Sequence, residues 1–308
     1  MRQTNFDFMG RRKVAAGFSI VLVLVAVLEL GINGLNMGLD FTGGTLVEVG
    51  FDTPADAEAI RQYLNTSGYA NGTVQFFGTN RDILIRMPPQ PGVEQASLGD
   101  EIFQALRTEY GKVELRQSSY VGPAVGQELT EDGGLALLTA LIVVMFYILF
   151  RFTKQFSVGA VTALAHDVLI VLGCFAVFHW TFDLTVLAAL LAVIGYSLND
   201  TIVVSDRIRE NFRKLRKGTP VEVINQSLNQ TLGRTLVTSA TTLFVLLALL
   251  FTGGETIRGF ALALSIGVVV GTYSSIYVAA NILLTMNITR EDLLVPEREE
   301  ENPDGSYP

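Results

Sequence analysis

The chain has 308 residues, of which 49% are hydrophobic and only 17% are charged. Together with a positive mean hydropathy, this composition favours a polytopic membrane protein with one modest soluble domain over a globular enzyme. The formal net charge of -8 is the sum of segments of opposite charge. Residues 36–133 and the tail are acidic and the other polar segments are basic, so the net charge does not indicate a cationic partner.

The single cysteine, Cys174, excludes an intrachain disulfide. The two histidines and this cysteine are scattered and give no metal-ligand spacing. We therefore expect no metal and no other cofactor, and we expect no nucleic-acid partner.

The first apolar run, Val14–Ile32, follows a basic cluster at 11–13 and is interrupted only by Glu29. About 20 apolar residues suffice to cross a bilayer. A secretory signal would have a shorter apolar core and a small-residue cleavage site, and neither is present. The pattern predicts an uncleaved first transmembrane helix over 14–35, after a cytoplasmic segment over 1–13.

The polar segment 36–133 shows the periodicities of a small α+β domain. Its expected elements are, in order, strand Thr45–Phe51, helix Pro54–Ser67, strands Val74–Phe77 and Asp82–Met87, helix Ser97–Tyr110, and strand Val113–Val121. The order β-α-β-β-α-β predicts a ferredoxin-like domain, with an antiparallel sheet and two helices on one face. The segment contains no catalytic triad, paired acids or phosphate loop, and Gly43-Gly44 lacks the third glycine of a nucleotide fingerprint. We therefore do not expect an enzyme.

Five more apolar runs follow. They predict a membrane domain over 134–284 and an acidic tail over 285–308, with helices at about 135–151, 156–178, 184–205, 235–251 and 257–284. Lys and Arg are concentrated before the first helix and in the second and fourth connections, whereas the third and fifth connections hold only Arg258. This asymmetry predicts that both termini are cytoplasmic and that the α+β domain faces the other side of the membrane.

The stretch 184–217 holds the main functional candidate, because Asp200 lies in its apolar part and the chain then turns basic. A carboxylate at the centre of a membrane helix costs roughly 2.5–3.5 kcal/mol on insertion scales, and proton relays use such residues. The structural alternative is an ion pair that locks helices together. Arg234 opens the next span from the same side and could meet Asp200, although it could also extend to the lipid headgroups.

Other polar residues could support this site. Asn199 precedes Asp200, and Asp167 shares a face of its span with Gly159 and Ala163. A polar stripe on the fifth span begins at an arginine and predicts an interior polar track; it comprises Arg234, Thr238, Thr241 and Thr242.

Two aspartates on neighbouring spans loosely resemble an intramembrane aspartyl protease. However, neither Asp167 nor Asp200 lies in a glycine-flanked catalytic context, and a protease would leave the large outward domain unexplained. A ridge of small residues on the sixth span predicts close packing, for which we expect a partner protein; it comprises Gly259, Ala263, Gly267, Gly271, Ser275 and Ala279.

Four blocks of sequence resemble a known family. They are Asp40-Phe41-Thr42-Gly43-Gly44 after the first span, Val121-Gly122-Pro123-Ala124-Val125-Gly126, Ala165-His166-Asp167-Val168, and residues 194–212. In this order across six spans they resemble the bacterial SecD and SecF translocase subunits. The short outward domain favours the SecF branch over the SecD branch.

This resemblance implies a subunit of the resistance-nodulation-division superfamily in the bacterial inner membrane, with its α+β domain in the periplasm. It implies that the chain pairs with SecD, associates with SecYEG, YajC and YidC, and uses the proton-motive force to pull preproteins outward and release them. Asp200 and Arg234 would form the proton path, with protons as the only coupling ion. A proton-driven exporter of small molecules or lipids from the same superfamily remains the alternative.

The resemblance also draws attention to the link that joins the first span to the α+β domain. Gly43 and Gly44 within the signature 40–44 allow either a hinge or a tight turn into the first strand. The basic run from Arg207 to Lys217 is expected to contact anionic lipids.

Overall fold

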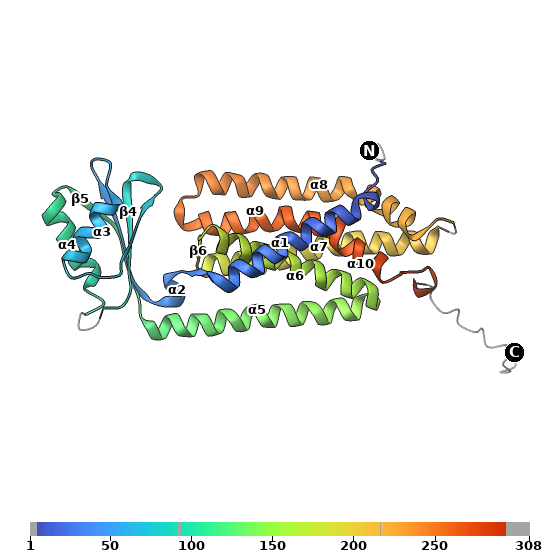
Figure 1. Ribbon diagram of the computed structural model, residues 1–308, viewed down its shortest axis with the longest axis horizontal. Helices are drawn as coiled ribbons and strands as arrows, with labels where there is room; N and C mark the ends of the chain where they lie inside the picture. The colour runs from blue at the N-terminus through green and yellow to red at the C-terminus, as the bar shows by residue number, and fades with distance from the viewer. Residues whose placement is uncertain (1–4, 91–93, 216, 294–308) are drawn as a thin grey trace, which may run out of the picture.

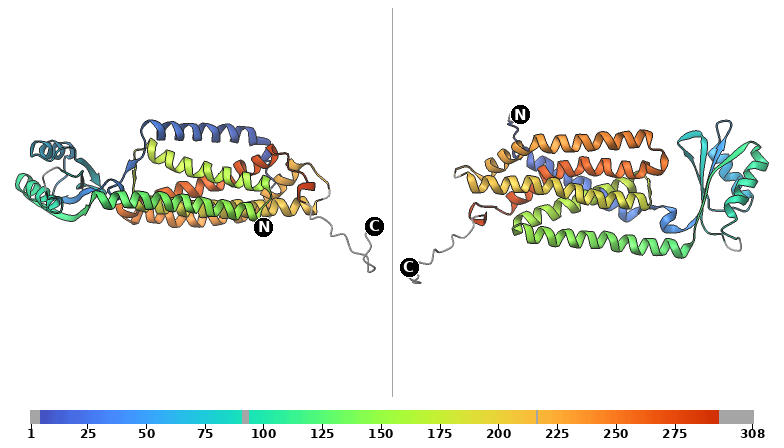
Figure 2. Two further views of the ribbon diagram at one scale, coloured as in Figure 1. Left: turned by 90° about the horizontal axis from the view of Figure 1, so that it is seen from below. Right: turned by 180° about the vertical axis from the view of Figure 1, so that it is seen from behind.

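The computed structural model describes residues 5–90, 94–215 and 217–293. An α+β domain sits at one end of an elongated helix bundle, and α1 begins and α10 ends at the opposite end (Figures 1 and 2). Parts of the predicted end segments, 1–4 and 294–308, lie outside the described residues.

Six helical segments among the described residues are long and apolar enough to cross a membrane, as predicted. They contain α1 (Arg12–Ile32), α5 (Pro123–Arg151), α6 (Lys154–Val177), α7 (Leu184–Lys214), α8 (Pro220–Thr252) and α9 (Glu255–Ser274), the last continuing through a π-helical turn (Ser275–Ala279) into α10 (Ala280–Thr285). A short 3-10 helix, Met9–Arg11, precedes α1, and another, Glu291–Leu293, follows α10.

Three of these helices extend well beyond the predicted spans. α5 begins at Pro123 and α8 at Pro220, rather than at residues 135 and 235, and α7 continues to Lys214 rather than ending at 205. The start of α8 is fixed by a capping box, in which Thr219 Oγ1 and the Glu222 carboxylate each accept a backbone N–H. Apolar composition predicts the part of a helix inside the membrane, but caps determine where the helix begins.

The polar ends of α7 and α8 pack against each other as a helical pair. Ile208 and Phe212 of α7 share an apolar cluster with Ile224 of α8. Asn211 Nδ2 donates hydrogen bonds to Ser227 Oγ at 2.8 Å and to Gln230 Oε1 at 2.9 Å. The basic stretch after Asp200 is therefore largely helical and packed on its inner face.

The α+β domain is built on a four-stranded antiparallel sheet with the order β3-β4-β2-β5. Its elements are β2 (Gly44–Phe51), α3 (Ala57–Thr66), β3 (Thr73–Phe77), β4 (Thr79–Met87), α4 (Leu98–Tyr110) and β5 (Val113–Val121). Val47 and Ile85 of the sheet share an apolar core with Ile60 of α3 and Ile102 of α4. α3 begins after Asp56, whose carboxylate accepts from the Glu58 and Ala59 N–H groups, rather than at Pro54.

A small joint, not predicted from the sequence, connects the α+β domain to the bundle. β1 (Asn36–Met37) pairs in parallel with β6 (Thr181–Phe182), and the short helix α2 (Leu39–Thr42) follows β1. These strands tie the end of α1 to the connection between α6 and α7. Strand pairs of two residues carry no periodic pattern from which they could be predicted.

The ridge of small residues on the sixth span packs within this chain, contrary to the expected partner contact. A Cβ atom added at Gly259 or Gly267 would collide with Val186 or Val193 of α7. At Gly271 it would lie 3.1 Å from the Cβ atom of Ser197. α7 and α9 therefore approach closely because the small residues of α9 leave room for the side chains of α7.

We predict that Gly267→Ala lowers the free energy of unfolding by about 1–3 kcal/mol, because its methyl group would be forced into Val193. Gly17→Ala on α1 is the matched control, since a Cβ atom there meets nothing within 4 Å. Unfolding of the purified protein in detergent would measure both. Equal stability of the two variants would contradict the internal packing of the ridge.

Candidate functional site

Asp200 is buried where α7, α8 and the π-helical turn meet, with only 8% of its surface exposed. Its Oδ1 accepts a hydrogen bond from Thr235 Oγ1 of α8 at 2.7 Å, and its Oδ2 accepts one from Ser275 Oγ at 2.5 Å. A buried carboxylate needs such donors because it has left water. The carboxylate thereby joins three segments of the bundle.

Asp167 of α6 forms a second buried carboxylate site, and it is 0% exposed. Its Oδ2 accepts from Ser197 Oγ of α7 at 2.5 Å and from Ser274 Oγ of α9 at 2.7 Å. Its Oδ1 lies 2.8 Å from His166 Nδ1. This carboxylate therefore links α6, α7 and α9.

Consecutive serines of the sixth span serve the two carboxylates. Ser274 is the last residue of α9 and Ser275 is the first of the π-helical turn. Neighbouring positions on a helix point about 100° apart, because one turn takes about 3.6 residues. One hydroxyl can therefore reach α6 while the next reaches α7. Single π-helical turns are often found at functional sites.

Each of these hydroxyls has a second acceptor within reach. Ser275 Oγ lies 3.0 Å from the Thr272 carbonyl oxygen, and Ser274 Oγ lies 3.1 Å from that of Gly271. A serine hydroxyl carries one proton, so it donates fully to only one acceptor at a time. If a carboxylate takes up a proton, its serine can turn to the helix backbone without losing a hydrogen bond.

The structure does not bring Arg234, Asn199 and Thr238 into this site. Their side chains are exposed on this chain, whereas the hydroxyl groups that bind the Asp200 carboxylate come from Thr235 and Ser275. Thr238 Oγ1 donates to the Arg234 carbonyl oxygen at 2.6 Å.

The polar stripe predicted on α8 lies on the outer face of this chain rather than in its interior. Thr241 and Thr242 also donate to carbonyl groups of their own helix. The inward-facing polar positions are Thr235 and Ser239, one residue later in the sequence. Ser239 is hydrogen-bonded to Tyr196 of α7 and to Thr272 of α9.

Sequence reasoning missed most of the donors, namely His166, Ser197, Thr235, Ser274 and Ser275. Ser and Thr are common in membrane helices and were treated as small or neutral residues. The spacing of Thr231, Thr235 and Ser239 at every fourth residue was the signal that could have identified the inner face of α8.

The signature 40–44 is bound to the start of α7. Asp40 Oδ2 accepts from the backbone N–H of Leu184 at 2.9 Å, and Phe41 stacks on Phe182 with ring centroids 6.0 Å apart. Gly43 and Gly44 have φ values of 67° and 125°, which favour glycine. The segment forms a tight turn leading directly into β2.

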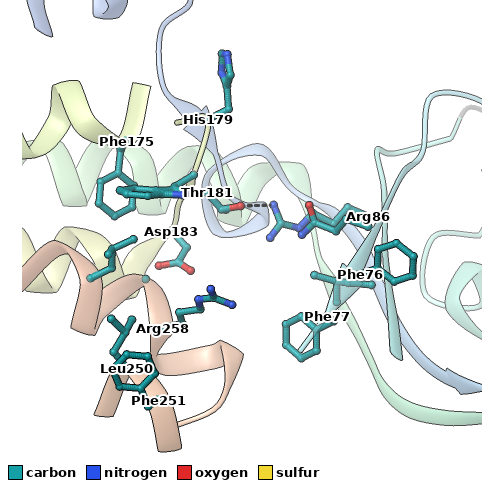
Figure 3. A pocket seen from close by; sticks show the side chains of 15 residues that line it. Phe76, Phe77, Arg86, Phe175, His179, Thr181, Asp183, Leu250, Phe251 and Arg258 are labelled. Atoms are coloured by element: carbon teal, nitrogen blue, oxygen red, sulfur yellow. Dashed lines mark hydrogen bonds between the residues drawn. The ribbon is translucent and has the colours of Figure 1, made fainter. Parts of the chain in front are cut away.

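A cavity of about 450 Å³ separates the open face of the sheet from the bundle (Figure 3). Phe76 and Phe77 line it from the sheet, and Asp183 and Arg258 line it from the bundle. Arg86 Nη1 crosses this gap and donates to Thr181 Oγ1 at 2.9 Å.

Arg86 lies at this boundary together with the charged side chains of Asp183 and Arg258. Burial lowers the pKa of its guanidinium, and the nearby carboxylates of Asp183 and Asp40 act in the opposite direction. Arg86 is thus the polar contact between the sheet and the joint strand β6, and it lies close to the carboxylates that hold the start of α7.

Comparison with known proteins gives a consistent result. The family described as "Protein export membrane protein SecD/SecF, C-terminal" matches residues 102–289, and the "SecD/SecF GG Motif" matches residues 30–55. The "Protein translocase subunit SecF" of Vibrio alginolyticus is 51% identical over 300 residues, covering 97% of this chain and 95% of the relative. The protein of the same name from Escherichia coli O157:H7 is 45% identical over 301 residues, covering 97% and 93%.

Two crystal structures of SecDF resemble the chain. The SecDF from Thermus thermophilus, a translocon-associated membrane protein, matches with a TM-score of 0.84 and 37% identity. SecDF in a super-membrane-facing form matches with a TM-score of 0.69 and 38% identity. Each match covers 92% of this chain and 39% of the SecDF chain. The chain therefore corresponds to one part of the longer SecDF chain.

We predict that Ser275→Ala lowers the free energy of unfolding by about 0.6–1.7 kcal/mol, because Asp200 would lose one of its two hydroxyl donors. Ser265→Ala is the matched control on the same helix, since Ser265 Oγ bonds only to the Ala261 carbonyl oxygen in the described part of the chain. Unfolding in bicelles would compare the two. A larger loss in Ser265→Ala would contradict the assignment.

Proposed function

The chain belongs to the SecD/SecF family of protein export membrane proteins, on its SecF branch, and on that premise we propose that it is a proton-driven subunit of the export machinery. It is a multi-pass membrane protein and a translocase subunit that associates with SecD. In the proposal, it uses the proton-motive force to promote preprotein movement through SecYEG and release on the outer side.

The observation that carries this proposal is the hydroxyl-bound carboxylate of Asp200. When Asp200 is charged, Thr235 and Ser275 hold α8 and the π-helical turn against α7. When it is protonated, Ser275 can turn to the Thr272 carbonyl oxygen, and the contact between the helices weakens. Proton uptake thus becomes a change in helix packing.

The energies involved are compatible with such a switch. A proton that crosses the full membrane potential releases about 2.3 kcal/mol per 100 mV. A hydrogen bond between membrane helices contributes about 0.6 kcal/mol on average. One proton can therefore outweigh the one or two hydrogen bonds that change partners at Asp200.

The start of α7 provides a route from this site to the α+β domain. Asp40 holds the backbone N–H of Leu184, and Phe41 stacks on Phe182. β2 begins at Gly44, directly after this signature. A shift or rotation of α7 would therefore pull on the first strand of the sheet. The hydrogen bond between Arg86 and Thr181 forms a second connection between the α+β domain and the helix bundle.

The proposed orientation rests on the basic residues. The start of α1, the start of α6 and the junction of α7 and α8 lie at the end of the bundle away from the α+β domain (Figures 1 and 2). These are the regions enriched in Lys and Arg. We place this end in the cytoplasm and the ferredoxin-like domain in the periplasm, with the bundle in the inner membrane.

The proposal gives Arg234 a place in the proton path in another state of the assembly. Its side chain lies on an exposed face of α8 that also carries Val237 and Val245. An apolar face of this kind in a membrane helix can contact either lipid or other helices. We propose that the SecD half covers it and directs the Arg234 charge toward Asp200.

SecYEG, YajC, YidC, translocating preproteins and anionic lipids are the further proposed partners, and protons are the coupling ion. The alternative of a small-molecule or lipid exporter gains no support from relatives that are themselves named translocase subunits.

We predict that Asp200→Asn assembles with SecD but loses the stimulation of export by a proton gradient, because an amide keeps the shape and cannot carry the proton. Export of a preprotein into inverted membrane vesicles, with and without a gradient, measures this. ATP-driven export should continue. Asp206→Asn is the matched control on α7, since Asp206 forms a half-exposed pair with Arg151. Full stimulation in Asp200→Asn would refute the proposal.

A second prediction concerns orientation and uses a chain in which Cys174 is replaced by Ser. Cysteine at the exposed position of Gln104 in α4 should react with a membrane-impermeant thiol reagent outside spheroplasts. Cysteine at the exposed position of Lys214 should react only after the membrane is opened. The opposite pattern of labelling would place the α+β domain in the cytoplasm.

A further inference from the structure

His166 is a buried titratable residue, and one of its two ring nitrogens has no hydrogen-bond partner in the described part of the chain. Its side chain is 6% exposed and its Nδ1 lies 2.8 Å from Asp167 Oδ1. Its Nε2 is buried and has no hydrogen-bond partner within the part of the chain that the structure describes. Nearly all buried polar atoms have a partner, so an unpaired imidazole nitrogen inside a membrane bundle requires an explanation.

His166 also forms part of the wall of a cavity of about 450 Å³ between α1, α6 and the end of the sixth span. Most of the wall is apolar, but hydroxyl and amide groups line it as well, from Ser19, Thr162, Tyr277 and Asn281. Because Nδ1 faces Asp167, the opposite edge of the ring, with Nε2, is turned away from that carboxylate.

The cavity lies toward the end of the bundle that we place in the cytoplasm. It begins at Ala16, one turn after the start of α1, and reaches Asn281, one turn before the end of α10. Thr162 is about two turns from the start of α6. These three helix ends lie together at the end of the bundle away from the α+β domain (Figure 1).

We propose that His166 and Asp167 form a second proton-binding unit, which takes a proton from the Asp200 site and releases it at His166 Nε2 into this cavity and on to the cytoplasm. The inference rests on the proposed function, because it assumes that protons pass through Asp200. It adds a release group and an exit on the cytoplasmic side.

The proton balance is simple. A neutral imidazole whose Nδ1–H donates to Asp167 has a lone pair on Nε2 and can bind one proton there. Asp200 loses one proton and becomes a carboxylate, while the His166–Asp167 pair gains one and holds it as an imidazolium beside a carboxylate. The Nε2 proton then leaves to water in the cavity, and the pair returns to its starting charge.

In the proposal, the proton passes between the two sites through the hydroxyl groups that bind the carboxylates. Ser275 bonds to Asp200, its neighbour Ser274 bonds to Asp167, and Ser197 bonds to Asp167 one turn before Asp200 on α7. Hydroxyls donate and accept, so they can pass a proton without carrying a charge at rest. Ser197 packs against Gly271 of α9, about one turn before Ser274 and Ser275.

The other titratable groups around the pair are few in the described ranges. Tyr273 of α9 stacks on the imidazole with centroids 6.2 Å apart, and its hydroxyl bonds to Ser19 and to the Ala15 carbonyl oxygen of α1. Tyr277 lines the cavity.

The test uses inverted vesicles, whose cytoplasmic face meets the medium, with the size of the proton gradient held constant while the pH of the medium is varied. In His166→Gln the side-chain amide can still donate to Asp167 but cannot carry a proton. We expect gradient-stimulated export to be largely lost and its dependence on the pH of the medium between about 5 and 8 to flatten. ATP-driven export and assembly with SecD should not change.

His179→Gln is the matched control, because His179 is the other histidine of the chain and is exposed next to β6. It should keep the stimulation and the pH profile of the unmodified protein. If His166→Gln does the same while Asp200→Asn is inactive, the release unit is refuted and the proposed function stands. If Asp200→Asn also keeps its stimulation, the proposed function itself fails.

A second variant tests the exit if His166→Gln does not accumulate. Ala165→Phe places a large side chain in the wall of the cavity and should slow the same step. Val158→Phe, on an exposed position of α6 that is not part of this wall, should not. Equal stimulation in these two variants would refute an exit through the cavity.

Discussion

The structure depends on the requirement that a carboxylate inside an apolar bundle be surrounded by donors. Burying an unpaired charge is far more costly than any single packing contact can offset. Asp200 and Asp167 meet the requirement by drawing hydroxyl groups from neighbouring helices. The two acids therefore determine which faces of α6, α7, α8 and α9 must meet. In the proposed mechanism, the same bonds are the ones that proton uptake rearranges.

Close approach of the helix backbones makes this arrangement possible. A serine side chain is short, so Ser274 and Ser275 reach the carboxylates only because the sixth span lies close to its neighbours. Gly267 and Gly271 allow that distance by leaving room for Val193 and Ser197 of α7. The small-residue ridge thus acts within the subunit, where it brings the donors to the acids.

Sequence patterns predicted those helices and strands whose apolar residues recur at a regular spacing. The strands and helices of 44–121 and the six membrane helices follow from apolar spacing, and both acids were identified because charge in a membrane is costly. Apolar spacing did not show which side chains of α8 point toward the neighbouring helices. Arg234 and Thr235 are neighbours, and only packing against α7 determines that Thr235 faces Asp200. The helix ends beyond the membrane were missed because caps, rather than hydropathy, place them.

The single helix α7 contacts the signature 40–44, the carboxylate sites and α8 along its length. Asp40 holds its first N–H group, Asp200 lies near its middle, and Phe212 packs its final turns against α8. A packed helix transmits movement along its axis with little loss, because its interior bonds do not stretch appreciably. A change in the hydrogen bonds at Asp200 that moves α7 must therefore act at both ends of the helix. At the start of α7 the signature turn passes directly into β2, so in the proposed mechanism such a movement would reach the α+β domain.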